Sequence, residues 1–416
     1  MDMVKWLFYG GAVVFGLVRA VLIVRQMRYV WRRRMDVPEA FAARVEATQQ
    51  LRAAEYTLAK NRLALWQLAL EIGLLVLATG LGGLSRLAQI VTSLSVPGLW
   101  SGVLLLVSVM VLVSGAELPL ELYRKFGVEA RFGFNTARWR DVLRDMLLQT
   151  MLGLVLGVPL IFAILWTIAR MGQHWWLYAW LLWVGFNVLL MAVFPVWIAP
   201  LFNRFTPLPE GEIKDRIGRL LQQCRFAAEG LYVMDGSKRS RHGNAFFTGF
   251  GHNRRIVLFD TLLERLQPVE IEAVLAHELG HFYHRHVLGR MVGIFVVSLG
   301  LLWGVAQVMQ HPDFFMALNL GLPSAPVALA LLLLALPVFS LPVQVLIGML
   351  SRRQEFQADD YAAEKVGARP LIEALVRLYR DNATSLYSDP WYSLCFDSHP
   401  NAQQRVTHLL AHEVGV

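Results

Sequence analysis

One short stretch of the 416-residue chain has the residue types and spacing of a metal site: His277-Glu278-Leu279-Gly280-His281. Two histidines four residues apart lie on one face of a helix, so both imidazoles can reach the same zinc ion. Glu278 would then stand beside the metal as a general base for water. The alternative is a pair of surface histidines beside a membrane. The uncharged neighbours favour the metal site, because they suit a helix that is buried on its other side.

A catalytic zinc needs a third protein ligand and an open position for water. Two apolar segments of membrane-spanning length separate His281 from Glu355, so the chain returns to the same side of the membrane near Glu355. Asp359 lies four residues further on, on the same helix face, where it can accept a hydrogen bond from a ligand histidine and fix the ring. The alternative is two solvated acids. Since His284 and His286 do not continue the i, i+4 face, we expect both to be interfacial or structural.

The composition shows what kind of molecule must position these residues. Hydrophobic residues make up 56% of the chain and charged residues 17%, and the mean hydropathy is +0.46. Soluble domains carry about 25% charged residues. This balance excludes a plain soluble enzyme and a disordered chain, and it indicates a polytopic membrane protein.

Apolar runs of about the ~20 residues that cross a bilayer occur seven times. They lie at about Val4–Val24, Ala64–Leu84, Gly102–Leu118, Met146–Ala169, Trp175–Ile198, Val287–Met309 and Pro326–Leu350. Glu71 falls inside the second run and either lines a water-filled interior or pairs within the bundle. Pro337 and Pro342 interrupt the seventh, which neighbouring helices can tolerate.

The basic residues predict the orientation. Four segments, 25–62, 120–145, 199–286 and 351–416, contain 34 of the 39 Lys and Arg residues. Basic loops stay in the cytoplasm, so we expect an external N-terminus and a cytoplasmic C-terminus and zinc site. The net charge of +8 is therefore explained without nucleic acid.

The two cytoplasmic segments around the zinc motif define the expected fold. GEIKDRIGRLLQQCRF has helical periodicity, and LYVMDGS, NAFFTGF and RRIVLFD predict two or three strands of a small sheet. We expect a mainly α polytopic membrane protein with seven transmembrane helices and a cytoplasmic zinc-binding domain with a small β-sheet; the chamber that the helices enclose is implied by the resemblance described next. Its parts are five transmembrane helices in 1–198, the sheet and HELGH helix in 199–286, two transmembrane helices in 287–350, and a C-terminal cytoplasmic region in 351–416.

Several longer motifs accompany HELGH: AAEYTLAKNRLAL (53–65), DGSKRSRHGNAFFTGFGHNRRIVLFDTLL (235–263), SRRQEFQADDYA (351–362) and SHPNAQQR (398–405). With them, the sequence resembles the type I CAAX prenyl endopeptidases, which are seven-helix membrane zinc proteases, and their bacterial relatives. The resemblance extends over essentially the whole chain. It implies a water-filled chamber closed at the cytoplasmic end by the zinc domain, one Zn²⁺ bound by His277, His281 and Glu355, and Glu278 as the base.

The resemblance implies three further roles. Asn244 would hold the substrate backbone beside an edge strand, His399 would stabilise the oxyanion, and Arg405 would bind the substrate near its carboxylate end. A positioned His or Arg can stabilise the negative charge that forms on an attacked carbonyl oxygen. Without the resemblance, these residues would be interpreted as a turn asparagine, a helix-flanking histidine and a surface arginine.

The expected partners are a peptide or membrane-protein substrate, possibly prenylated, and membrane lipids, with no nucleic acid and no obligate protein partner. The compact loops suggest a bacterial inner membrane. Because bacteria generally do not prenylate proteins as eukaryotes do, we expect membrane-protein processing or quality control as the physiological work. A transporter would leave HELGH and Glu355 without a role, and a zinc scaffold without turnover would not need Glu278.

Overall fold

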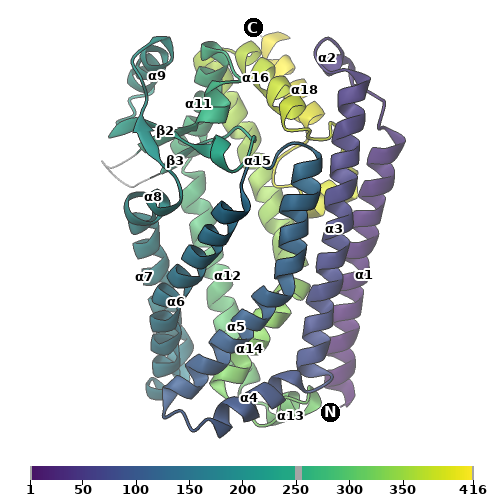
Figure 1. Ribbon diagram of the computed structural model, residues 1–416, viewed down its shortest axis with the longest axis vertical. Coiled ribbons are helices and arrows are strands. Elements are labelled where there is room, and N and C mark those ends of the chain that lie inside the picture. Colours follow the sequence, from purple (N-terminus) through teal and green to yellow (C-terminus); the bar gives the residue numbers. More distant parts are fainter. Residues whose placement is uncertain (1, 249–254, 415–416) are drawn as a thin grey trace.

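The computed structural model describes residues 2–248 and 255–414, and it is mainly helical (Figure 1). Its two ends lie at opposite ends of the elongated molecule. The long membrane-region helices are α1 (Asp2–Arg32), α3 (Ala47–Thr79), α5 (Leu99–Leu122), α6 (Trp139–Arg170), α7 (Trp175–Val193), α12 (His286–Val308), α14 (Ala325–Phe339) and α15 (Leu341–Val366). Short helices α2 (Glu39–Ala42), α4 (Gly83–Ser93), α8 (Ala199–Phe202), α10 (Asp260–Leu263) and α13 (Pro312–Ala317) connect these and other elements.

Six helical segments of the described chain are long and apolar enough to cross a membrane, and α14 with α15, bent by 58°, gives a seventh when the pair is counted as one span. The seven expected spans are therefore confirmed. The bend follows from two prolines, because Pro337 and Pro342 each lack the backbone N–H that a continuous helix would use. Helices α5 and α7 continue as π-helices over Tyr123–Glu129 and Phe194–Ile198, and a 3-10 turn over Gly172–His174 precedes α7.

Two helices differ in extent from the apolar runs that predicted them. The first helix continues past Val24 to Arg32, because the basic segment that follows the apolar run has helical propensity of its own. The second helix begins at Ala47 and ends at Thr79, before the expected Leu84. Gly82, in the left-handed conformation at φ 68°, turns the chain into the short helix α4.

A partly buried ion pair and a hydrogen bond join three spans. Nη1 of Arg19 on α1 lies 2.9 Å from Oε2 of Glu71 on α3, and the same nitrogen donates to the Pro337 carbonyl of α14 at 2.9 Å. Pro337 is in the last turn of its helix, where carbonyl groups lack helical partners. Of the two alternatives for Glu71, the structure therefore has the paired one.

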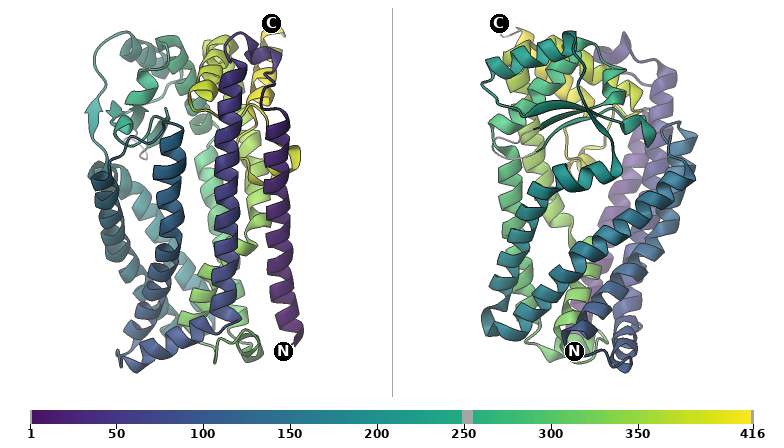
Figure 2. Two further views of the ribbon diagram at one scale, coloured as in Figure 1. Left: turned by 45° about the vertical axis from the view of Figure 1, so that its right-hand side comes forward. Right: turned by 60° about the vertical axis from the view of Figure 1, so that its left-hand side comes forward.

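The small sheet has four strands in the order β1-β2-β4-β3 (Figure 2). The expected runs form β2 (Gly230–Met234), β3 (Ala245–Thr248) and β4 (Arg255–Phe259), although residues 249 and 250 of the NAFFTGF run and residue 254 of the RRIVLFD run lie outside the described residues. β1 (Phe205–Pro207) was not expected, because its segment is rich in proline. Proline is tolerated there since β1 lies at an edge of the sheet. β3 forms the opposite edge and pairs only antiparallel with β4 within this sheet.

The sheet packs on the helix that carries HELGH, α11 (Pro268–Tyr283), together with α9 (Glu212–Gln223). The fully buried Leu258 of β4 shares one hydrophobic cluster with Ile271, Leu275 and Leu279 of α11. On its other side, α11 lies against α15 and α16 (Ala368–Asp381), and α17 (Pro390–Phe396) and α18 (Ala402–Val414) complete this end of the molecule. α11 is thus held between the sheet and the C-terminal helices.

Gly280 permits the close approach of α11 to α15. A Cβ atom on Gly280 would lie 2.9 Å from the Ala358 Cα and 3.2 Å from its carbonyl oxygen, which is nearer than packed atoms come. Glycine is used where two backbones must approach this closely. The glycine of the HELGH motif thereby brings its two histidines next to Glu355 and Asp359.

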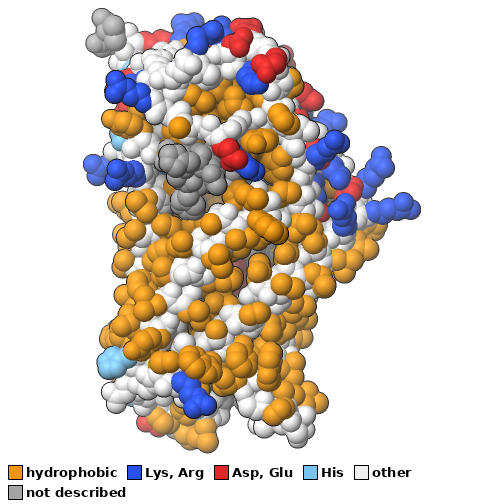
Figure 3. All heavy atoms as spheres, turned by 90° about the vertical axis from the view of Figure 1, so that its left-hand side faces the viewer, with side chains coloured by type: hydrophobic (Ala, Val, Ile, Leu, Met, Phe, Trp, Pro, Cys, Tyr) orange, Lys and Arg blue, Asp and Glu red, His pale blue; other side chains and the backbone are white. Residues whose placement is uncertain are grey.

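The surface divides into an apolar and a basic region (Figure 3). Hydrophobic side chains cover the middle and lower parts of the face shown, whereas most Lys and Arg side chains gather toward the end that carries the sheet. Exposed apolar side chains on the spans include Val14, Leu147, Leu181 and Val296. Such a broad apolar surface is expected where lipid replaces water as the solvent.

Candidate active site

Helix α11 begins at Pro268, and the first turn is fixed by a capping box between Gln267 and Glu270. The N–H of Gln267 donates to the Glu270 carboxylate at 2.8 Å. Such a cap satisfies donors that the helix start leaves free. The helix then runs without a break through His277 and His281, so their rings share one face as the spacing predicted.

The two histidines meet Glu355 of α15. Nε2 of His277 lies 3.5 Å from Oε2 of Glu355, and Nε2 of His281 lies 3.3 Å from Oε1. Zinc bonds of about 2.0–2.2 Å at tetrahedral angles place two donor atoms about 3.4 Å apart. Oε2 of Glu355 is buried and receives no well-directed hydrogen bond in the described chain, although His399 Nδ1 lies 2.8 Å away. Donor types, separations and this unsatisfied oxygen all fit a metal ion bound by the three residues.

His277 has a charged support behind it. Its Nδ1 lies 2.8 Å from Oδ1 of Asp359, which is fully buried. Burial and the nearby guanidinium of Arg405 lower the pKa of His277, but hydrogen bonds to Asp359 and Glu355 raise it more, to about 9. Metal binding must therefore displace a proton from this ring near neutral pH. Asp359 fixes the ring so that Nε2 faces Glu355.

Arg405 of α18 lies behind Asp359 rather than in an open substrate channel. Its Nε and Nη2 donate to the two oxygens of Asp359, at 2.9 and 2.5 Å, and Nη2 lies 3.3 Å from Nδ1 of His277. The side chain is buried, so its planar fork is already used by Asp359. This placement favours support of the metal site, and binding of a substrate carboxylate by Arg405 stays a prediction.

His281 has a neutral support, which the sequence reasoning missed. Its Nδ1 lies 2.9 Å from Nδ1 of His286, whose Nε2 lies 3.0 Å from Oε1 of Gln357 on α15. If Gln357 accepts from Nε2–H, His286 accepts from Nδ1–H of His281, and Nε2 of His281 remains free to bind a metal. His286 is buried, whereas its neighbour His284 is exposed.

The chain turn that places His286 is strained. Arg285 adopts φ 56° and ψ 32°, a left-handed conformation that is uncommon for residues other than glycine. The turn ends α11 and begins α12, so that the first residue of α12 folds back under His281. A signal was present in the sequence, because His286 is a second histidine within five residues of HELGH, but helical spacing alone could not place it beyond the turn.

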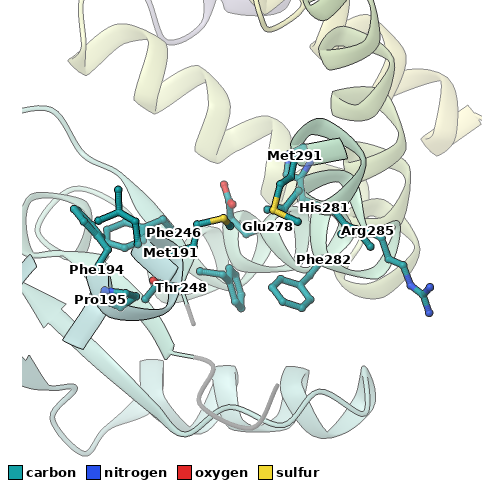
Figure 4. A pocket seen from close by; sticks show the side chains of 14 residues that line it. Met191, Phe194, Pro195, Phe246, Thr248, Glu278, His281, Phe282, Arg285 and Met291 are labelled. Carbon is teal, nitrogen blue, oxygen red and sulfur yellow. The ribbon is translucent and has the colours of Figure 1, made fainter. Parts of the chain in front are cut away.

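Glu278 lines a cavity of 620 Å³ (Figure 4). His281, Phe282, Phe246 and Met291 are among the side chains that line it, and most of the lining is apolar. The cavity lies where α7 and α12 of the membrane region meet α11 and β3. A carboxylate beside the metal ligands and facing such a cavity can act as a base on water held there.

The two remaining expected site residues differ in their placement. His399, 60% exposed, approaches Glu355 from the loop before α18 and so reaches the ligand cluster. Asn244 precedes edge strand β3, and its side-chain oxygen accepts the N–H of Ala245 at 2.8 Å. Asn244 does not line the cavity with Glu278, whereas Phe246 and Thr248 of the same strand do.

Comparisons with known proteins agree with this geometry. Residues 26–204 match the family model described as CAAX prenyl protease N-terminal, five membrane helices, and residues 207–413 match peptidase family M48. A CAAX prenyl protease 1 homolog of Arabidopsis thaliana is 36% identical over 293 residues, 70% of this chain and 69% of the relative. The chain belongs to peptidase family M48. The Homo sapiens homolog is 32% identical and covers 70% of both chains.

A solved structure extends the likeness to nearly the whole chain. The crystal structure of S. mikatae Ste24p matches with a TM-score of 0.89 and 26% identity over 98% of both chains. The expected fold class is therefore confirmed, as is a multi-pass membrane metalloendopeptidase of the CAAX prenyl protease type. The relatives named here are eukaryotic.

Proposed function

We propose that this protein is a zinc endopeptidase that cleaves an extended peptide near its C-terminus, next to an attached apolar lipid. The observation that carries the proposal is the position of Glu278, which shares one helix with two ligand histidines and faces an apolar cavity bordered by an edge strand. In this proposal His277, His281 and Glu355 hold one Zn²⁺. Imidazole and carboxylate donors suit zinc, and three protein ligands leave a position for water.

Bound zinc would lower the pKa of a water molecule and polarise the scissile carbonyl. The chain's own residues supply the rest of the chemistry. Glu278 takes the proton of the attacking water and returns it to the leaving amine. His399, at the mouth of the ligand cluster, donates to the carbonyl oxygen as its negative charge develops. The supports behind His277 and His281 keep both rings in place during the reaction.

The substrate class follows from the walls of the cavity. Strand β3, at one edge of the sheet that the described residues form, would offer its outer side to an extended peptide, which binds by adding a strand, and Asn244 would align the backbone where that strand begins. The lining from Met191, Phe194 and Met291 suits a hydrocarbon chain. A prenylated CAAX peptide has both features, as the names of the relatives suggest. The membrane parts 1–198 and 287–350 would then hold lipid in a chamber, while 199–286 and 351–416 supply the catalytic groups.

The basic end of the molecule carries the sheet and the metal ligands. We place this end in the cytoplasm and the N-terminus outside, since basic loops are retained on the cytoplasmic side. The compact loops favour a bacterial inner membrane. There, lipid-associated membrane proteins would be the physiological substrates for processing or quality control.

The test uses purified zinc-loaded protein with a farnesylated CAAX peptide, and mass spectrometry identifies the product. We expect release of the C-terminal tripeptide. Glu278→Gln should keep one zinc per chain and lose about 10²–10⁴-fold in kcat, the contribution of general base catalysis. Asp313→Asn, which changes an acid far from HELGH in the sequence, is the control and should leave kcat unchanged.

A non-prenylated peptide of the same sequence separates the lipid from the peptide requirement. We expect a higher KM for it, because the apolar cavity then loses its occupant. Full activity of Glu278→Gln would reject the base assignment. Cleavage at internal bonds with no preference for the C-terminus would reject the proposed substrate class while leaving zinc proteolysis in place.

A further inference from the structure

A second cluster of metal-binding side chains lies outside the active site, between α15 and α18. His408 and His412 are four residues apart on α18, and Nε2 of each approaches the same Oδ1 of Asp360, at 2.5 and 2.7 Å. One donor atom from each residue lies within 4.8 Å of the others. Asp360 is next to Asp359 in sequence but about 100° around the helix from it, so the two carboxylates serve different clusters.

We propose that Asp360, His408 and His412 form a second, peripheral Zn²⁺ site. Two imidazoles at i, i+4 and a carboxylate are a donor set that suits zinc. The same set is present at the candidate active site, and here it lies between the packed helices α15 and α18. The side chains are 32–40% exposed, which leaves room for a water molecule as a fourth ligand.

The spacing of the donors predicts a weaker site than the catalytic one. In the catalytic cluster the donor atoms lie 3.3 and 3.5 Å apart, close to the separation of about 3.4 Å that zinc imposes. In the peripheral cluster they are at hydrogen-bond distance, so the side chains must separate by less than 1 Å to admit the ion. Partly exposed side chains can make this change by small rotations, but the two hydrogen bonds are lost.

One side chain of the cluster is already held in place. The ring of His408 packs on Phe356 of α15, with 4.7 Å between centroids. Metal binding therefore needs to order chiefly His412, the more exposed histidine. A bound ion would join α18 to α15 one turn beyond the Arg405–Asp359 pair, so its occupancy should stabilise the packing on which His277 depends.

The experiment measures zinc per chain in the full-length protein, by elemental analysis and by titration calorimetry. We expect wild type to bind one zinc tightly and a second at least tenfold more weakly, and the second equivalent should raise the melting temperature. His408→Ala with His412→Ala should bind one zinc, keep full peptidase turnover, and show no rise in melting temperature on further zinc. His174→Ala with His311→Ala, which changes two histidines of neither cluster, should retain both equivalents.

His412→Ala alone provides a variant that keeps the His408–Phe356 contact, and it should lose at least tenfold in affinity for the second equivalent. Co²⁺ added to protein already loaded with one zinc should give a visible absorption band in wild type and none in the double variant. One zinc per wild-type chain at all concentrations would overturn the proposal. So would a second equivalent that persists in the double variant.

Discussion

The two histidines of the proposed zinc site are supported in different ways, although their rings face the same carboxylate. His277 is backed by the Asp359–Arg405 ion pair, which is buried and charged. His281 is backed by His286 and Gln357, a chain of neutral groups. The first support needs a residue from α18, far along the chain, whereas the second begins at the turn that directly follows α11.

From this difference we infer that the candidate metal site depends on two kinds of helix packing. The neutral support forms when α11 turns into α12 and meets α15. The charged support forms only when α18 docks, because Arg405 must reach Asp359 across the helix packing. A carboxylate behind a ligand histidine also increases the basicity of the ring, and a neutral acceptor increases it less. The Asp359–Arg405 support of His277 should therefore contribute more than the neutral support of His281 to metal affinity and to the free energy of unfolding.

The largest effect is expected from Asp359→Asn. The change removes the carboxylate from His277 and leaves Arg405 buried without its partner. Breaking a buried pair in this way costs about 3–5 kcal/mol, and metal affinity should fall by about 100-fold or more. Chelator competition and thermal unfolding measure the two effects. Glu373→Gln, in a partly exposed pair with Arg44, is the control and should cost under about 1 kcal/mol.

Gly280→Ala tests both supports together. The added methyl would collide with the Ala358 backbone, so α11 and α15 must move apart. Both histidines would then lie farther from Glu355. Overpacking of this kind costs about 1–3 kcal/mol, and we expect zinc affinity to fall by about tenfold or more. Gly289→Ala is the matched control, since its Cβ would meet no atom within 4 Å. Equal zinc affinity in the two variants would show that close helix packing does not set the site.

Arg405→Lys distinguishes metal support from substrate binding. Lysine keeps the charge but not the planar fork, so the bidentate contact with Asp359 is lost. We expect zinc affinity to fall by about tenfold, with the ratio of KM for a free-carboxylate peptide to KM for its amide unchanged. A rise in KM for the free-carboxylate peptide alone would instead support the role that the sequence resemblance implied.

The smallest effect on zinc affinity is expected from changes to the neutral support of His281. His286→Ala removes the acceptor of His281 Nδ1–H, and zinc affinity should fall by about tenfold, the lower end for such supports. His284→Ala, which changes the exposed neighbour, should have no effect on affinity. Gln357→Glu would turn the neutral chain into a charged one, and we expect it to raise zinc affinity above that of wild type. A loss as large as that of Asp359→Asn in His286→Ala would remove the proposed asymmetry.

The sequence predicted the parts that depend on local pattern. Apolar runs located all seven spans, and the i, i+4 spacing placed His277 with His281 and Glu355 with Asp359 on their helix faces. It did not predict β1, because a proline-rich segment resembles a loop until a neighbouring strand pairs with it. It also missed the burial of Arg405 and the support from His286, since both depend on contacts made after a turn or between distant helices. Helical periodicity carries no information on such contacts.

The Arg19–Glu71–Pro337 contact has a consequence for biosynthesis. Arg19 enters the membrane before either partner, toward the far end of the first apolar run, and inserting an arginine into a lone helix costs up to about 2.5–3.5 kcal/mol, the value at the helix centre. Glu71 follows 52 residues later and neutralises this charge, so α1 and α3 become a stable pair soon after synthesis. Pro337 is 318 residues from Arg19 and joins last. The bent seventh span, which leads directly to Glu355, thus docks onto a pair of helices that is already in place.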